Sequence, residues 1–331
     1  MNAVVRKVLR VQPDEAVEVK ESVDFSAGLT AEERKEADEI ADVVVASALR
    51  GALNRIDPAR YPVGSDPDRL DVRIAATMAR LPAKATERIA PRVLKVADGS
   101  RKLKRVDPGV LHDSGAVEKL LDSRRLIVPR PKIETDIEVR QGGSAKYNRA
   151  ILELRAIHCI QETSGGGADE IVFGGVCIGA SGNCSPMEAF DAKDFDSGTY
   201  AEFGQLQIGR YSLNTVKGYP FHLYATFLLV ESDSDAGDTA REMNNTLSSI
   251  ASMGGLYAGP AAGAVAVVSN VIDRLIDAFF GDDAFRPYGI RLSFNDGDPF
   301  DGKSTGPRQR TGDITGDGAK YRIGYRWVLS A

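Results

Sequence analysis

Cysteine and histidine are both scarce in this chain of 331 residues, with three of each. The cysteines are odd in number and form no CxxC pair, which argues against a disulfide framework and favours a reducing compartment. So few histidines give little support to a catalytic triad, and we interpret His158 and His222 as structural residues of strands. Zinc is disfavoured because His158 and Cys159 are neighbours in a strand and point to opposite faces.

No apolar run at the start of the sequence is long enough for a signal peptide. Cytoplasmic synthesis is therefore the default expectation, and export by a leaderless route stays open. The net charge is −5. Residues 1–140 carry 26 basic and 24 acidic groups, and the rest of the chain carries 16 and 23. This balance makes nucleic acid an unlikely partner.

The length suggests more than one domain. Residues 1–28 are charged and weakly patterned, which indicates an extended arm or edge strand. We predict a helical region over residues 29–121, a Pro- and Gly-containing linker over residues 122–148, and a β-rich region over residues 149–331. The expected fold class is α+β.

Three helices are expected in the front region. Thr30 and Glu33 have the spacing of a capping box, which predicts a helix from there to about residue 56, ended by Asp57-Pro58. A second helix is predicted to start at Ser65, and a third over residues 85–97. The basic residues that follow, between positions 92 and 105, are interpreted as a solvated surface.

Alternation of apolar and polar residues predicts antiparallel strands in the β-rich region. Near its start Leu152, Leu154, Ala156 and His158 share one parity, and residues 321–329 alternate in the same way. Further strands are predicted at residues 171–178, 203–213, 221–230 and 290–294. Their spacing favours a β-sandwich.

One segment interrupts this pattern. Residues 243–272 carry no charged side chain, and apolar residues continue at helical spacing to about residue 280. We predict a helical insertion over residues 240–281 that packs on the sandwich or on another subunit. The alternative is a membrane-active hairpin.

Acidic loops follow two of the predicted core strands, at residues 162–170 and 231–238. Calcium prefers six to eight hard oxygen ligands, which such loops supply if they adjoin. A phosphate-loop pattern at residues 297–304 is interpreted as a surface loop, because the run after it is poor in helix formers.

A strand, a glycine-containing loop, an Asp and an apolar strand, followed later by a strand that ends in D-x-D, together resemble a C2-type β-sandwich domain over about residues 150–240. The resemblance implies that Asp169 opens the second strand and that Asp233 and Asp235 are the D-x-D pair. Thr163 and Arg241 stand where further acidic ligands are expected. The candidate calcium ligands are Asp169, Glu170, Asp233, Asp235 and Asp238.

These features favour a non-enzymatic binding or assembly protein. Its C2-like sandwich is expected to recognise a protein partner, another copy of the chain or a membrane surface, with assistance from calcium. The alternative is a pore-forming-like, membrane-active protein that uses residues 243–272. A metal-assisted hydrolase is disfavoured because no base or nucleophile has a recognisable spacing.

Overall fold

In the computed structural model, the described residues are 8–10, 29–65, 71–72, 75–76, 79, 83–99, 149–164, 167–180, 182–213, 221–232, 236–254, 261–280, 283–294 and 310–330. The elements of the first half are β1 (Val8–Arg10), α1 (Ala31–Ile56), α3 (Ala83–Ala97), β2 (Arg149–Gln161) and β3 (Asp169–Ile178). Those of the second half are β4 (Cys184–Phe195), β5 (Thr199–Ser212), β6 (Phe221–Glu231), α6 (Ala236–Gly254), α7 (Ala261–Phe279), β7 (Tyr288–Phe294), β8 (Arg310–Gly316) and β9 (Ala319–Ser330).

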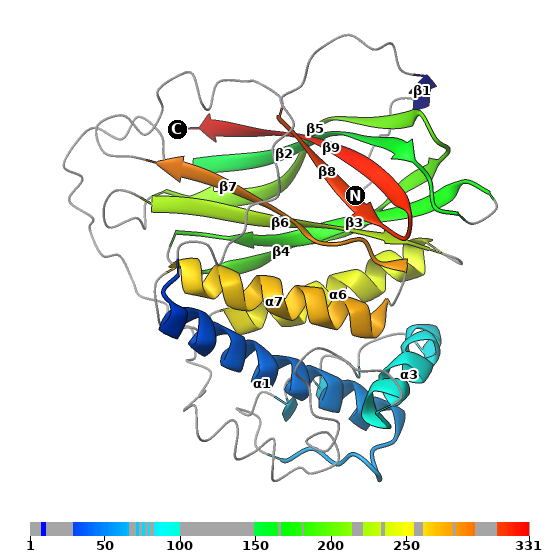
Figure 1. The fold of residues 1–331 in the computed structure, drawn as a ribbon, viewed down its shortest axis with the longest axis vertical. Helices are drawn as coiled ribbons and strands as arrows, with labels where there is room; N and C mark the ends of the chain where they lie inside the picture. The colour runs from blue at the N-terminus through cyan, green and yellow to red at the C-terminus, as the bar shows by residue number, and fades with distance from the viewer. Residues whose placement is uncertain are drawn as a thin grey trace.

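Two antiparallel sheets form a β-sandwich (Figure 1). One sheet has five strands in the order β1-β5-β2-β9-β8, and the other has four in the order β4-β3-β6-β7. The inner faces enclose a core that includes Phe173, Phe227, Tyr321 and Trp327. The predicted α+β class, with N-terminal helices followed by a β-sandwich, is confirmed.

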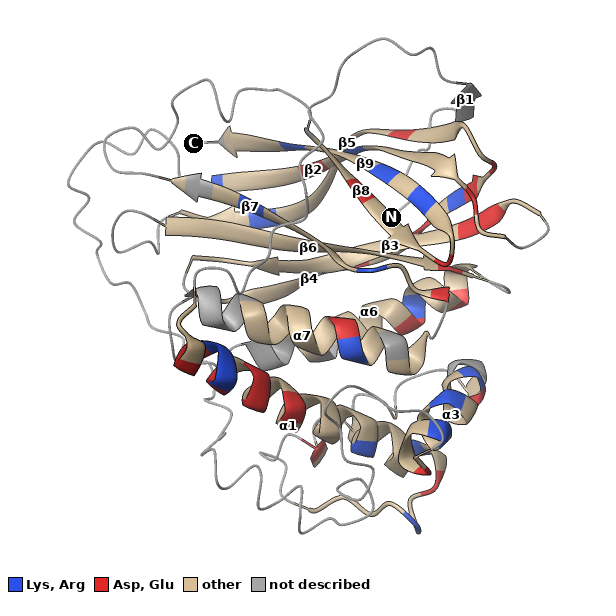
Figure 2. Cartoon of the chain, viewed as in Figure 1, with Lys and Arg blue, Asp and Glu red and all other residues tan. Residues whose placement is uncertain are grey.

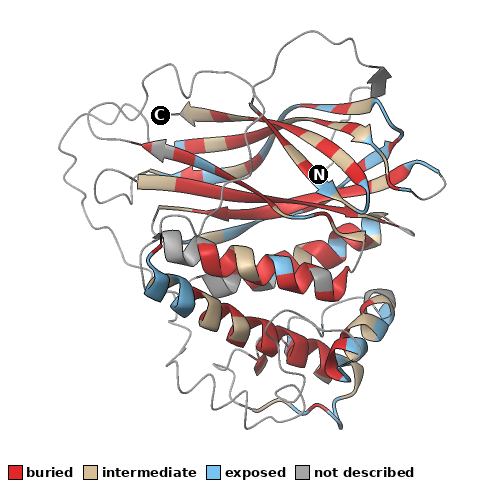
Figure 3. Cartoon of the chain, viewed as in Figure 1, coloured by how far each residue is buried: buried red, intermediate tan, exposed pale blue. Residues whose placement is uncertain are grey.

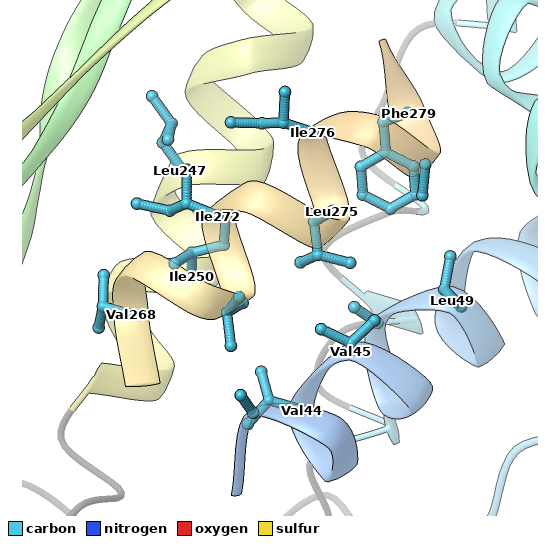
Figure 4. Packing of buried hydrophobic residues seen from close by; sticks show 14 of the residues in the cluster. Val44, Val45, Leu49, Leu247, Ile250, Val268, Ile272, Leu275, Ile276 and Phe279 are labelled. Carbon is cyan, nitrogen blue, oxygen red and sulfur yellow. The ribbon is translucent and has the colours of Figure 1, made fainter. Parts of the chain in front are cut away.

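Helices cover the outer face of the four-stranded sheet. α6 and α7 lie against this sheet, and α1 packs on α7 (Figures 1 and 3). Val44, Val45 and Leu49 of α1 face Leu275 and its apolar neighbours on α7 (Figure 4). One hydrophobic cluster contains residues of α1, α3, α6 and α7 and of this sheet face, so the front helices and the inserted helices share a core.

α1 begins and ends as its sequence predicts. The Thr30 hydroxyl accepts a hydrogen bond from the Glu33 amide, and the Glu33 carboxylate accepts one from the Thr30 amide. These bonds satisfy amides that have no partner inside the helix. Hydrogen bonds that the Thr30 amide and the Thr30 hydroxyl donate to the Glu33 carboxylate hold the pKa of that carboxyl below its usual range. The third predicted helix is α3, whereas much of the second lies outside the described residues.

The predicted face of the first strand is wrong beyond Leu154. A register shift of β2 between Leu154 and Ala156 moves Ile157 and Cys159 into the core and leaves His158 on the outer face. A β-bulge adds a residue to one strand and reverses the alternation after it. Sequence spacing alone does not reveal the bulge, because the partner strands that set it come from distant parts of the chain.

Strand β4 was missing from the sequence prediction. It contains Pro186 and several charged residues, which suit an edge strand better than a central one. α6 docks against this edge strand and its neighbour. The Asn244 amide accepts from the Ala189 N–H at 2.7 Å and donates to the Ala189 carbonyl at 3.0 Å. A side chain thus replaces a strand as partner for these backbone groups.

Candidate functional site

Four connections meet at one end of the β-sandwich. They join β2 to β3, β4 to β5, β6 to α6 and β8 to β9. The Gly198 amide donates to the Cys159 carbonyl, and the Gln161 side chain donates to the Gly318 carbonyl, each at 2.8 Å. The Ser232 amide donates to the Glu170 carbonyl at 2.8 Å. These bonds bring connections that are far apart in sequence to one end of the molecule.

We call this end the rim, defined as the described residues within 162–170, 193–198, 231–241 and 317–320. Acidic side chains dominate it (Figure 2). Its basic residues are Lys193, Arg241 and Lys320, and its acidic residues are Glu162, Asp169, Glu170, Asp194, Asp196, Glu231, Asp238 and Asp317. The rim is therefore a region of negative potential.

The two predicted acidic loops adjoin at the rim. Ile171 of β3 lies opposite Glu231 of β6 in the antiparallel pair, so the start of one strand neighbours the end of the other. The Thr163 hydroxyl reaches both sides, 2.7 Å from Asp169 Oδ1 and 3.4 Å from Glu231 Oε1.

Asp169 is buried, with 1% of its surface exposed. Its carboxylate accepts hydrogen bonds from the Thr163 amide at 3.0 Å, from the Thr163 hydroxyl at 2.7 Å and from the Tyr321 hydroxyl at 2.5 Å. Buried carboxylates need such donors to offset the loss of water. Thr163 stands where the C2 resemblance expects another carboxylate, and here it acts as a donor to Asp169.

The other predicted ligands are placed differently. Glu170 is half-buried beside Asp169 at the start of β3. Asp238 is in the first turn of α6 and forms an ion pair with Arg241. Asp233 and Asp235 lie outside the described residues. Among the residues that are described, no group of three or more His, Cys, Asp or Glu side chains is arranged to hold a metal ion, and the metal assignment stays a prediction.

Titratable groups next to Asp169 are held in their neutral forms. Burial raises the pKa of the Cys159 thiol to about 11, and burial together with the hydrogen bond to Asp169 raises the pKa of Tyr321. Burial also raises the pKa values of Cys177 and Cys184 to about 12. A thiol must be deprotonated to act as a nucleophile, so none of these cysteines is activated.

Sequence reasoning missed Ser197 as a rim residue and missed Tyr321 as the hydrogen-bond donor to the rim residue Asp169. The Ser197 hydroxyl accepts from the Glu162 amide, and the Glu162 carboxylate accepts from the Ser197 amide, both at 3.1 Å. Period-two alternation identifies Tyr321 as a core residue, but only the packing of the two sheets on each other brings it to Asp169.

Fold and rim together define an α+β protein whose β-sandwich has one strongly acidic end. No protein-family model matches the chain, and no curated protein matches it. In the part of the chain that the structure describes, no helix is both long and apolar enough to cross a membrane.

Proposed function

We propose that this chain is a non-enzymatic binding or assembly protein that uses a C2-like β-sandwich to recognise a partner at the acidic rim. The observation that carries the proposal is the convergence of four connections with eight acidic and three basic described residues at one end of the sandwich. Loops held by a rigid sheet scaffold are common sites of recognition.

The charge of the rim favours a basic partner surface. Complementary charge speeds association and suppresses wrong partners. Asp194 at the end of β4 and Asp196 in the β4–β5 connection are exposed, so a partner has direct access to them. The partner is a Lys- and Arg-rich protein surface, with another copy of the chain and a membrane surface as the other candidates.

A binding role also agrees with the state of the potential nucleophiles. The thiols of all three cysteines are protonated at neutral pH, because burial raises their pKa values. Burial is the main cause that lowers the pKa values of His158 and His222.

Calcium assistance belongs to this proposal. The cation needs carboxylate oxygens, and Glu170 and Glu231 lie at adjoining strand ends. Asp169 already accepts three hydrogen bonds, so a calcium ion that used it would compete with Thr163 and Tyr321 for its oxygens. Calcium that binds only the folded protein raises the melting temperature. The test is whether it does so in the wild type and fails to do so in Glu170→Gln.

Binding at the rim is tested with a labelled Lys-rich peptide. The variant Asp194→Asn/Asp196→Asn removes two exposed negative charges from the rim, and the control Glu32→Gln/Glu36→Gln removes two from exposed positions of α1. We expect the rim variant to lose affinity and the control to keep it. Equal losses of affinity in the two variants would mean that the peptide responds to the net charge of the protein and not to the rim. If the wild type does not bind the peptide, the basic-partner proposal is refuted.

The membrane-active alternative requires α6 and α7 to leave the fold. Both helices contribute buried residues to the shared core. Polar contacts also fix them: Arg88 of α3 pairs with Glu242 at 2.8 Å, and Asp42 of α1 pairs with Arg274. Dye leakage from phosphatidylserine vesicles tests this alternative, which predicts leakage by the wild type and less leakage when a disulfide joins α1 to α7.

A further inference from the structure

The outer face of the five-stranded sheet carries no helix among the described residues. α6 and α7 pack on the four-stranded sheet, and α1 and α3 pack on α7 (Figure 1). On β2, Ala150, Leu152 and Leu154 point into the sandwich core, so the residues that alternate with them belong to the outer face. This sheet therefore has one face without a second layer in the described part of the chain.

Four arginines lie on this outer face, at the end of the sheet where β2 begins. We call them the arginine patch, which consists of Arg149 and Arg155 of β2, Arg210 of β5 and Arg326 of β9. The strand pairing brings them together. Ile151 of β2 lies directly opposite Arg210, and Glu153 lies directly opposite Arg326. Arginines from three strands thus occupy one surface.

The arginine patch carries a net positive charge. In the three strand segments that form it, residues 149–155, 206–212 and 324–330, the only acidic residue is Glu153. Its buried carboxylate accepts from Arg326 Nε at 2.9 Å. It also lies 2.7 Å from Arg326 Nη2 and 3.7 Å from Arg155 Nη1. Four positive charges and one negative charge leave the patch at +3.

Two of the four arginines are directly accessible. Arg149 and Arg210 are exposed. Arg210 donates to the Gln207 side chain at 2.9 Å, and this neutral amide does not compensate its charge. Ile151 beside them is half-buried, and so is its partner Val328 on β9. A small apolar centre with a polar surround is the usual anatomy of a protein interface.

The arginine patch and the acidic rim lie at opposite ends of the β-sandwich. β2 begins with Arg149 of the patch and ends at Gln161, whose side chain donates to the Gly318 carbonyl at the rim. A strand rises about 3.3 Å per residue, so the 13 residues of β2 span about 40 Å. The patch therefore cannot meet the rim of its own copy, and contact between the two surfaces joins different copies.

We propose that the arginine patch of one copy binds the acidic rim of a second copy. The rim has eight acidic and three basic described residues, and the patch has four basic and one acidic. Complementary charge of this kind selects partners and speeds their association. Since the two surfaces differ, the contact is heterologous, and it repeats to form a ring or a filament. This inference rests on the proposed recognition at the rim and names the partner.

Sedimentation velocity at low ionic strength, over a wide range of concentration, tests this assembly. The wild type is expected to form species larger than a dimer, which dissociate as salt is added because salt screens exposed charges. The patch variant Arg149→Gln/Arg210→Gln and the rim variant Asp194→Asn/Asp196→Asn are each expected to weaken the association about tenfold. Circular dichroism checks that these exposed substitutions leave the fold intact.

Matched controls remove the same charges from another surface. Arg34→Gln/Lys35→Gln removes two positive charges and Glu32→Gln/Glu36→Gln removes two negative charges, all from exposed positions of α1. Both controls are expected to assemble as the wild type does. If the controls weaken the association as much as the patch and rim variants, net charge and not these two surfaces controls it, and the proposal is overturned.

A mixture of the patch variant and the rim variant is decisive. The intact patch of the rim variant binds the intact rim of the patch variant, whereas the two neutralised surfaces associate only weakly. We therefore expect a one-to-one heterodimer of wild-type strength and no larger species. A mixture that forms no heterodimer overturns the proposal.

Other results also count against it. A wild type that is monomeric at every concentration, or an assembly that the patch variant keeps, overturns the proposal. Binding of a labelled Glu-rich peptide to a monomeric wild type would assign the patch to a different acidic protein.

The Lys-rich peptide separates this inference from the proposed function. If the wild type binds the peptide but stays monomeric, recognition at the rim stands and only the second copy as partner is overturned. If it neither binds the peptide nor assembles, both proposals fall. If it assembles, the peptide competes with the arginine patch for the rim and is expected to dissociate the assembly. An assembly that binds the peptide without dissociating overturns the patch as the partner of the rim.

Discussion

At the residue scale, Asp169 illustrates how a predicted ligand can hold a fold together. Three donors from two distant parts of the chain converge on its carboxylate. The arrangement links the start of β3 to the start of β9 across the sandwich. Its carboxylate therefore stabilises the rim whether or not a cation or a partner binds there.

We predict that Asp169→Asn lowers the free energy of unfolding by about 2–4 kcal/mol, because the new NH2 group cannot accept the bonds that the oxygen accepted. Tyr321→Phe removes one donor and is expected to cost about 1–3 kcal/mol. Urea unfolding measures both. Glu170→Gln, at the next position, is the control and should change stability by less than about 0.5 kcal/mol. Equal stability of Asp169→Asn and wild type contradicts a structural role.

Gly175 is a second residue whose identity the packing requires. A Cβ at this position of β3 would lie 2.1 Å from the Thr226 carbonyl oxygen and 2.9 Å from Met187 Sδ. The Thr226 carbonyl belongs to the backbone of β6 and cannot move without disturbing the sheet.

Gly175→Ala is therefore expected to destabilise the protein by about 3 kcal/mol or more, at the upper end of overpacking effects. The matched control is Gly179→Ala, where the nearest atom to the new Cβ is the Asn183 carbonyl oxygen at 3.7 Å. Thermal unfolding should show a large fall in melting temperature for the first variant and a small change for the second. A similar fall for both would mean that the strand backbone adjusts freely.

At the element scale, ion pairs of two partly exposed arginines connect α3 to α6 and to the end of α7. Arg88 donates to Glu242 of α6 at 2.8 Å and to the Thr239 hydroxyl at 3.1 Å. Arg92 pairs with Asp283 at 2.5 Å and donates to the Phe279 carbonyl at 3.0 Å. Burial raises the pKa of Glu242 to about 7, and Arg88 and Arg92 oppose this rise.

This shift predicts a pH dependence of stability. Because folding raises the pKa of Glu242 from 4.5, the folded state favours the protonated acid. The contribution of Glu242 to the free energy of unfolding is therefore fully present below pH 4.5. It is lost as the pH rises to about 7, and the loss is on the order of 3 kcal/mol. His158 and His222, whose pKa values are lowered, act in the opposite direction below pH 6.5.

Comparison of variants isolates the effect of Glu242. Glu242→Gln stays neutral and keeps an acceptor for Arg88, so it should be more stable than the wild type at pH 8 and nearly equal to it at pH 4.5. Glu87→Gln, at an exposed position of α3, is the control. Urea unfolding across this range gives both differences. A stability difference that does not vary with pH would show that folding does not shift the pKa of Glu242.

At the scale of the whole molecule, the shared core joins regions that the sequence separates by residues 122–148. Leu49 of α1 and Leu275 of α7 belong to one hydrophobic cluster (Figure 4). Burying one such side chain contributes about 1.5–3 kcal/mol. The domain boundaries themselves remain predictions.

We expect a fragment of residues 149–331 to be markedly less stable than the full chain and to bind the dye ANS, because it exposes the face of α7 that α1 covers. A fragment of residues 29–331 keeps this cover and should resemble the full chain. ANS fluorescence and urea unfolding report the difference. If the fragment 149–331 binds no dye and is as stable as the full chain, then residues 149–331 form an independent domain.

Local patterns in the sequence were enough to determine the α+β class, the capping box that starts α1 and the strands that alternate strictly, because these depend on neighbours within a few residues. Tertiary structure alone decided that Cys159 faces the core, that β4 is an edge strand held by Asn244, and that Tyr321 donates to Asp169. Each of these depends on how strands pair or on how a helix or the second sheet packs against them, and the contacts that decide it join residues 55 to 162 positions apart. No window of sequence contains both partners.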